Sequence, residues 1–294
     1  PAGAVVCGRA AELERLEEAL AAAARGRTAC VWLRGAAGVG KSSLVQAFVA
    51  ALQARGDVTV LSGRCYEHES VPFKAFDSLV DALADHLAAL APDELAPLAG
   101  GHIGELARVF PVLQRVPELR DMVQGTRPAA SEQESRRKGF AALGRLLGAL
   151  AVRGRLVLVL EDLHWTDVDS VRLLADLLAP PDAPPLLLLA TYRADWPGDP
   201  LALPEFERLQ LRVWPELHVA RLDVGRLDGR DAYAAAAALL AAADLPERPW
   251  AATIADEARG DSLVLELLVA ELAARRDRLA GQDPKDLSFE RWLS

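Results

Sequence analysis

Hydrophobic positions recur at two spacings along this chain, and the alternation of the two spacings predicts its architecture. Leu13, Leu16 and Leu20 share one face of an expected helix, whereas the next segment is a short β-rich run. The predicted elements are a helix over 10–24, a strand over 28–33, a glycine cluster over 35–40, a helix over 41–54 and a strand over 58–61. This order of strand, helix and strand favours a parallel sheet with helices on its faces.

Two later segments, 156–160 and 186–190, are continuous apolar runs. Central strands of a parallel sheet are covered on both faces, so they have this pattern instead of an alternating one. A weaker strand is expected over 219–224, which brings the expected strands to five. The chain is therefore predicted to be an α/β protein.

The segment from about 64 to 130 has a different pattern. It is helical around 74–90 and is then interrupted by five prolines, at Pro92, Pro97, Pro111, Pro117 and Pro128. We expect a mostly helical insertion here instead of further strands. The run Ser131-Glu132-Gln133-Glu134 matches a capping box, which predicts a helix from there to about residue 152.

After residue 225 the pattern becomes helical throughout. Helices rich in Ala and Leu are expected over about 229–243, 247–258 and 262–275, and no strand signal remains. We therefore predict two domains, an α/β domain over 1–225 and a small helical lid domain over 226–294. The last residues of the lid domain are expected to form a linker.

Composition and charge narrow the functional classes. Of the 294 residues, 51% are hydrophobic and 26% charged, as in globular proteins, and 33 basic against 42 acidic side chains give a net charge of −9. An acidic balance attracts neither DNA nor anionic membranes, so we expect no direct nucleic-acid partner and no membrane partner. No apolar run approaches the ~18 residues of a membrane span, and the start at Pro1 has no signal-peptide pattern. We expect a cytoplasmic fragment of a longer protein.

The three cysteines, Cys7, Cys30 and Cys65, stand far apart without a CxxC pair. Zinc needs clustered ligands, so these residues are expected to be small buried apolar side chains. An odd count without a signal peptide suits a reducing compartment.

The strongest chemical signal is the run Gly35-Ala36-Ala37-Gly38-Val39-Gly40-Lys41-Ser42, a complete GxxxxGK[ST] match. A polyphosphate needs several backbone N–H groups that converge on its oxygens, and glycines let the chain curl closely enough to supply them. The helix that begins near Lys41 adds the positive end of its dipole. We expect Lys41 to reach the β- and γ-phosphates and the Ser42 hydroxyl to ligate Mg²⁺. The alternative, a chance glycine loop, does not explain its place between a strand and a helix.

Two adjacent acids, Glu161 and Asp162, follow the apolar run that ends at Leu160. A buried strand that ends in this way carries carboxylates to the edge of the sheet, where one can hold Mg²⁺ and the other can polarise an attacking water. The alternative is a pair of solvated acids at the end of a strand. His164 lies beside them, but a lone histidine is more often a hydrogen-bonded structural residue.

A third candidate is Arg193, which follows the run 186–190 after Thr191 and Tyr192. A cation at the end of a central strand can contact a γ-phosphate. Taken alone, an arginine paired with an acid at the surface is the simpler interpretation.

These segments together resemble a known family. Gly8-Arg9, the loop GAAGVGKS, the segment LVLVLEDLHWTD and the strand LLLLATYR resemble the signal-transduction ATPases called STAND, which are relatives of the AAA+ ATPases and the NLR immune receptors. The segments SGRCYE and VPFKAF resemble the bacterial modules that are joined to Ser/Thr kinases or LuxR-type DNA-binding domains. The resemblance covers nearly the whole chain.

The resemblance implies a P-loop NTPase fold and a role for each matching residue. The five-stranded parallel sheet is of the type in which the strand of Arg193 lies between the strands of the phosphate loop and the acid pair. Gly8 and Arg9 match a box beside adenine and ribose, Glu161 the acid on the Mg²⁺ side, Asp162 the acid that activates water, and Arg193 a sensor. The nucleotide-binding residues are then Gly8, Arg9, Gly35, Ala36, Ala37, Gly38, Val39, Gly40, Lys41, Ser42 and Ser43, the metal ligands Ser42 and Glu161, and the catalytic residues Lys41, Asp162 and Arg193.

Two departures from the family pattern change the expectation. Glu161 stands where Asp is more usual, so its carboxylate reaches one methylene further, which predicts slow hydrolysis. The family's Gly-x-Pro element corresponds to Gly260-Asp261-Ser262 here, so Ser262 replaces the proline that packs on adenine.

The sequence thus predicts an ATP-binding, slowly hydrolysing switch domain of a signalling protein, closed with ADP and self-associating with ATP. Its expected partners are nucleotide, Mg²⁺ and other domains of the parent chain. A P-loop kinase of a small acceptor and a module that binds nucleotide without hydrolysis are the alternatives. A DNA-remodelling AAA+ protein is disfavoured by the acidic balance.

Overall fold

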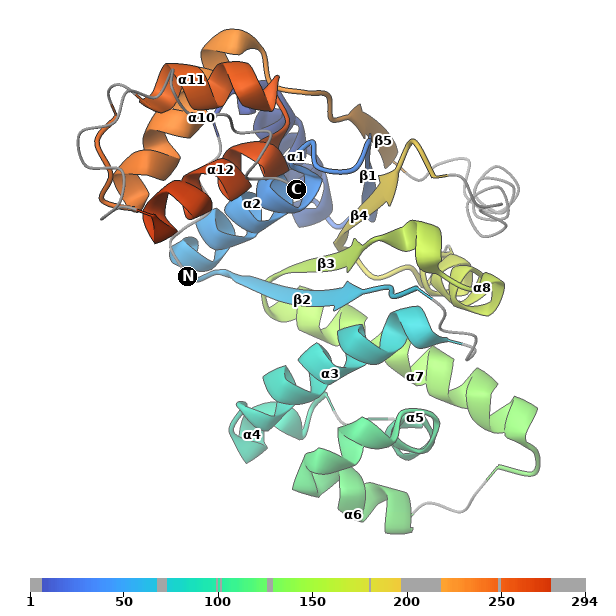
Figure 1. Ribbon diagram of the computed structural model, residues 1–294. Coiled ribbons are helices and arrows are strands. Elements are labelled where there is room, and N and C mark those ends of the chain that lie inside the picture. The colour runs from blue at the N-terminus through green and yellow to red at the C-terminus, as the bar shows by residue number, and fades with distance from the viewer. Residues whose placement is uncertain are drawn as a thin grey trace.

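Five parallel strands form a central sheet in the computed structural model (Figure 1). The structure describes residues 7–67, 73–98, 100, 102–125, 129–179, 181–196, 218–247 and 250–275. The strands are β1 (Ala29–Gly35), β2 (Val58–Arg64), β3 (Arg155–Glu161), β4 (Leu187–Arg193) and β5 (His218–Asp223). Their order is β2-β3-β4-β1-β5, and each neighbouring pair is parallel. The predicted parallel α/β sheet is confirmed, with β4 between β1 and β3.

The carboxyl ends of four strands bring the predicted chemistry to one edge of the sheet. Gly35, the last residue of β1, lies opposite Arg193 at the end of β4. Arg64, the last residue of β2, lies opposite Glu161 at the end of β3. Strands β1 and β4 run further toward this edge than the sequence pattern indicated, so Arg193 belongs to β4 itself. Ligands of open α/β sheets bind at this edge.

Both faces of the sheet are buried, as the continuous apolar runs predict. In β3, the leucines at 156, 158 and 160 pack on one face and the valines at 157 and 159 on the other. The leucine face is covered by α3 (Lys74–Ala88), α7 (Glu132–Arg153) and α8 (Val168–Leu177), and the valine face by α1 (Ala10–Ala24) and α2 (Lys41–Arg55). Figure 1 shows the two sets of helices on opposite sides of the sheet.

The predicted helical segment between residues 64 and 130 is confirmed in its described part, but it is not all insertion. Helix α3 packs against β2 and β3 and is part of the sheet's cover. Only the following elements, α4 (Pro92–Leu95), α5 (Ile103–Val109), the 3₁₀ turn η1 (Pro111–Arg115) and α6 (Pro117–Gly125), extend away from it. Three prolines stand at the first position of their element, where the missing N–H costs no hydrogen bond. These prolines therefore start helices as well as interrupting them.

The start of α7 corrects the predicted capping box. Ser131 caps the helix, and its Oγ accepts a hydrogen bond from Glu134 N–H at 3.2 Å, as expected. The Glu134 carboxylate, however, accepts from Ala130 N–H at 3.1 Å, one residue before the position that a capping box uses.

Three helices after β5 enclose a hydrophobic cluster of their own. They are α10 (Gly229–Ala242), α11 (Trp250–Ala258) and α12 (Ser262–Ala274), and their cluster includes the fully buried Leu240, Ile254 and Leu268. The predicted helical pattern after residue 225 is confirmed within the described residues. The second of these helices is predicted from 247 and is described from Trp250, and Ala251 N–H donates to Glu247 O at 2.9 Å, as in a helix that begins near the predicted residue. The expected linker after residue 275 lies outside the described residues.

No helix in the described ranges is long and apolar enough to cross a membrane.

Cys30 and Cys65 are buried and Cys7 is half-buried, and burial raises the pKa of the Cys30 thiol.

Candidate functional site

The loop between β1 and α2 is curled by glycines in a backbone conformation that other residues rarely adopt. Gly38 has a φ of 79°, and Gly40, which caps α2, has a φ of 94°. Helix α2 begins at Lys41, as predicted, and the exposed fraction of that side chain is 8%. Its Nζ donates to the carbonyl oxygens of Gly35 at 2.9 Å and Ala36 at 2.7 Å. The Lys41 ammonium thus hydrogen-bonds to the backbone of its own loop.

Burial lowers the pKa of the Lys41 ammonium, and the nearby carboxylates of Asp162 and Asp195 oppose this shift. The charged form of a partly desolvated ammonium is stabilised by any further anion that comes close to it. The electrostatics of the loop therefore suit a phosphate group.

The second residue of α2 contacts the first predicted acid. Ser42 Oγ donates to Glu161 Oε2 at 2.6 Å, which joins the loop on β1 to the end of β3. A hydroxyl and a carboxylate are the hard oxygen ligands that Mg²⁺ takes from proteins, with phosphates and waters supplying the others. The described residues contain no cluster of three or more His, Cys, Asp or Glu side chains that could hold a metal alone. The two residues fit a magnesium ion that is shared with a bound polyphosphate.

Both the backbone N–H and the side chain of Asp162 form hydrogen bonds with neighbouring strands. Its φ of 58° is unusual for a residue other than glycine, and its N–H donates to Thr191 Oγ1 at 3.0 Å. Its Oδ2 accepts from Arg64 Nε at 2.8 Å, and the Asp162 side chain is 24% exposed. Arg64 is not among the site residues predicted from the sequence. The strand order could have indicated it, because β2 is the neighbour of β3 and both end at this edge.

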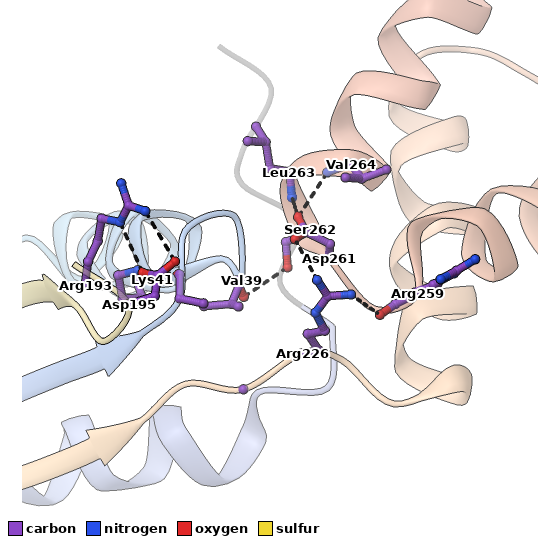
Figure 2. A network of polar contacts seen from close by, with 12 residues as sticks. Val39, Lys41, Arg193, Asp195, Arg226, Arg259, Asp261, Ser262, Leu263 and Val264 are labelled. Atoms are coloured by element: carbon purple, nitrogen blue, oxygen red, sulfur yellow. Dashed lines mark hydrogen bonds and ion pairs between the residues drawn. The ribbon is translucent and has the colours of Figure 1, made fainter. Parts of the chain in front are cut away.

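Arg193 pairs with an acid that was not among the predicted site residues, Asp195. Its Nε and Nη2 lie 3.2 and 3.3 Å from the two oxygens of Asp195 (Figure 2). Its guanidinium carbon lies 5.4 Å from the centroid of the Trp196 ring. The surface ion pair that was the simpler interpretation of Arg193 is therefore present. Its position at the end of β4, opposite Gly35, nevertheless places it beside the loop.

His164 packs in an aromatic cluster. Its ring centroid lies 5.3 Å from that of Trp165 and 4.9 Å from that of Trp196, and burial lowers its pKa. These ring contacts fit a structural residue, but the expected hydrogen bond is missing at Nδ1, which is buried and has no hydrogen-bond partner among the described residues.

The start of α12 packs directly on the loop (Figure 2). Leu263 N–H donates to Gly38 O at 3.0 Å, and Ser262 Oγ donates to Val39 O at 3.2 Å. Asp261 caps the helix by accepting from Leu263 and Val264 N–H, and a Cβ on Gly38 would lie only 2.6 Å from its Oδ1. Glycine at position 38 is thus required by backbone conformation and by this close approach. The helical cluster touches the loop through α12.

Arg9 is a buried link between the loop and the segment that follows β5. Its exposed fraction is 7%, and it donates to Val39 O at 2.9 Å and Gly225 O at 2.6 Å. Gly8, with a φ of 69°, packs so tightly on Asp231 that a Cβ would lie 2.2 Å from that residue's Cγ. The pair lies at the contact between the loop and the helical cluster.

The site matches a known family. The profile of the AAA ATPase domain matches residues 5–189, which is more than half of the chain. The chain belongs to the AAA ATPase domain family. Proteins of curated function include no match to this sequence.

Solved structures share the fold of this AAA domain. The Walker-type ATPase PABY2304 of Pyrococcus abyssi is 16% identical with a TM-score of 0.52, and the alignment covers 95% of this chain and 69% of that one. Cdc6p from Pyrobaculum aerophilum is 15% identical with a TM-score of 0.56, and 92% of this chain and 62% of that one are covered. At these identities the likeness shows the fold alone.

Two cavities adjoin the loop of the AAA domain. A cleft of 980 Å³ runs from the loop along α2, and its lining includes Lys41, Ser42, Glu161, Asp162 and Arg193. A second cavity, of 30 Å³, lies between the loop and the helical cluster and is lined in part by Cys7, Arg9, Ser262 and Leu265. The structure thus brings every predicted catalytic and metal residue to one cleft, and Arg9 of the predicted Gly8-Arg9 box to the small cavity next to it.

Proposed function

We propose that this chain is the ATP-binding and slowly hydrolysing switch domain of a larger signalling protein. The observation that carries the proposal is the hydrogen bond of the Ser42 hydroxyl to Glu161 at 2.6 Å, in a cleft that also holds Lys41 and Asp162. Such a constellation has the parts that phosphoryl transfer needs, which are a phosphate cradle, a cation, metal ligands and an acid.

In this proposal each residue has one task in binding or chemistry. The N–H groups of 35–42 and the Lys41 ammonium hold the phosphates, and Ser42 and Glu161 would hold Mg²⁺. Bound Mg²⁺ supplies a Lewis acid that neutralises charge on the phosphate oxygens. Asp162 orients a water and accepts its proton as the water oxygen bonds to the γ-phosphorus. The bond from that phosphorus to the β,γ-bridging oxygen breaks, and ADP leaves with phosphate as the second product. Arg193 stabilises the charge on the γ-phosphate.

Asp162 shares its carboxylate between this work and an ion pair. Its Oδ2 accepts from Arg64 in the present structure, which leaves Oδ1 as an acceptor for a water. An exposed ion pair of this kind is worth only about 0–1 kcal/mol, so it can be broken by modest rearrangement. Together with the longer side chain of Glu161, this contact supports slow turnover.

The switch itself would come from the lid. We propose a division into an α/β ATPase domain over 1–225 and a helical lid over 226–294, and the separate cluster of α10, α11 and α12 supports it. The contacts of Ser262 and Leu263 with the loop are those of a closed form, to which we assign ADP. ATP would favour an open form that self-associates, which requires that it bind the two forms with different free energy.

A P-loop kinase is the alternative with different chemistry. Its acceptor pocket would need unpaired cations, but in the described cleft Arg64 and Arg193 are each paired with an aspartate. A module that binds nucleotide without hydrolysis is the other alternative.

The proposal is tested by measuring phosphate release from ATP alone and in the presence of small acceptors. We expect slow release, without need of an acceptor, and larger particles by size-exclusion chromatography with a non-hydrolysable ATP analogue than with ADP. Phosphate transfer to an acceptor in place of release would favour the kinase. Tight ATP binding without any release would favour the binding module, and equal particle sizes would contradict the switch.

Ser262 offers a separate test of the lid. It is the first residue of α12, a position where proline is well tolerated, and it lines the small cavity. We expect Ser262→Pro to tighten ADP binding by about 0.5–1 kcal/mol, a two- to fivefold effect, because the ring adds apolar contact with the base. Calorimetry measures the affinity.

Ser262→Ala is the matched control, since it removes the hydrogen bond to Val39 O without adding a ring. An ADP affinity of the proline variant no tighter than that of the alanine variant, with unchanged circular dichroism, would mean that Ser262 does not face the base.

A further inference from the structure

Asp195 lies two residues beyond the end of β4 and has no role in the chemistry above. Its two carboxylate oxygens face Arg193 Nε and Nη2 at 3.2 and 3.3 Å, in the side-by-side arrangement by which guanidinium groups also bind phosphate. The Arg193 guanidinium and, more weakly, the backbone N–H of Ala37 in the phosphate loop lower the pKa of this carboxyl. Asp195 therefore lies between the end of β4 and the loop.

The surroundings of this carboxylate are those of a bound anion. Figure 2 shows Asp195 between Arg193 and the region of Lys41, and the Asp195 charge favours the protonated form of the Lys41 ammonium. A guanidinium therefore pairs with this carboxylate, and the Lys41 ammonium and the Ala37 N–H act on it electrostatically. These are the donors that a terminal phosphate would use at this place.

We propose that Asp195 sets the preference of the site between nucleoside triphosphate and diphosphate, because its carboxylate takes the place of a γ-phosphate on Arg193, beside the phosphate loop. This inference rests on the proposed function. A triphosphate must displace the carboxylate and then lies near its negative charge, whereas a diphosphate is one phosphate shorter and leaves the carboxylate where it is. Asp195 therefore weakens the binding of ATP more than that of ADP.

The opposite role is physically reasonable and gives the opposite result. If Asp195 only holds Arg193 in position for the γ-phosphate, its removal frees the guanidinium and weakens triphosphate binding. The side chain is 46% exposed, so the pair is partly screened by solvent and either effect is moderate.

The test is the affinity of Asp195→Asn for the β,γ-imido analogue of ATP and for ADP, each with Mg²⁺, by calorimetry. Asparagine keeps the size of the side chain but loses the charge. We expect the triphosphate analogue to bind about tenfold more tightly, as the removal of one like charge at a partly screened site implies, and ADP to change less than twofold.

The matched control is Asp57→Asn. Asp57 precedes β2, pairs with Arg155 at 3.3 Å and lies at the opposite end of the sheet, so it removes the same charge far from the loop. We expect no change in either affinity.

Three outcomes would overturn the inference. Weaker triphosphate binding by Asp195→Asn would make Asp195 a support for Arg193, an equal gain for both nucleotides would show a general charge effect, and unchanged affinities would show no role. A failure of the proposed function is recognised separately, because the wild-type chain would then bind neither nucleotide or would bind both as well after Lys41→Ala.

Discussion

Asp162→Asn is expected to bind ATP with Mg²⁺ as the wild-type chain does and to hydrolyse it about 100-fold or more slowly. The expected loss is that of a general base, because asparagine cannot accept the proton of the attacking water. The substitution suits the local structure, since asparagine tolerates the φ of 58° and its amide oxygen can still accept from Arg64. Binding is measured by calorimetry and chemistry by single-turnover hydrolysis.

Two further variants separate the acid's chemistry from its ion pair. Arg64→Ala removes the ion pair but keeps the carboxylate, so we expect it to hydrolyse ATP at least as fast as the wild-type chain. Glu161→Gln should weaken ATP binding that depends on Mg²⁺ and leave ADP binding without Mg²⁺ nearly unchanged. Normal ATP binding without hydrolysis in Glu161→Gln would mean that the roles of the two acids are reversed. Lower thermal stability with unchanged turnover in each acid variant would mean that both serve only the fold.

Lys41→Ala is expected to lose about 10- to 150-fold in ATP affinity. Lys41 is buried, with an exposed fraction of 8%, and a hydrogen bond to a charged group contributes about 1.5–3 kcal/mol, which corresponds to this range of affinity. The fold should tolerate the change, because Gly35 O keeps a second donor in Ala194 N–H at 3.1 Å. Calorimetry with ATP and with ADP measures the effect on both nucleotides.

Lys138→Ala is the matched control for that variant. Lys138 also pairs with an acid, Glu134 at 2.8 Å, but on α7, away from the loop. It should leave affinity unchanged. An unchanged affinity of Lys41→Ala itself would exclude this loop as the nucleotide site.

The sequence predicts the framework of the fold well because periodicity records burial. The runs at 156–160 and 186–190 are apolar on both faces, and the structure buries both faces of these strands. Helix α3 was assigned to an insertion instead of the sheet, because an amphipathic helix has the same pattern whichever apolar surface it covers. Strand order came from the family resemblance and not from periodicity.

Those residues of the candidate site that belong to sequence motifs could be predicted. Lys41, Ser42, Glu161 and Asp162 lie in runs with a fixed spacing, and the structure brings them together. The partners Arg64, Asp195 and Asp261 carry no such signal, since each depends on which elements become neighbours. The ion pair of Arg64 with Asp162 spans 98 positions and exists only because β2 and β3 are adjacent.

The 30 Å³ cavity beside Arg9 and Ser262 has a consequence for the kinetics of nucleotide exchange. It has room for about two water molecules and none for a purine ring. If the base belongs there, a nucleotide enters or leaves only while α12 is lifted from the loop, and association is slower than collision whenever a conformational change must come first. The residence time of ADP would then be set by the contacts of Ser262 and Leu263 with the loop as much as by contacts with the nucleotide. A protein that pulled on the helical cluster could shorten that time without touching the nucleotide, which is how an exchange factor acts.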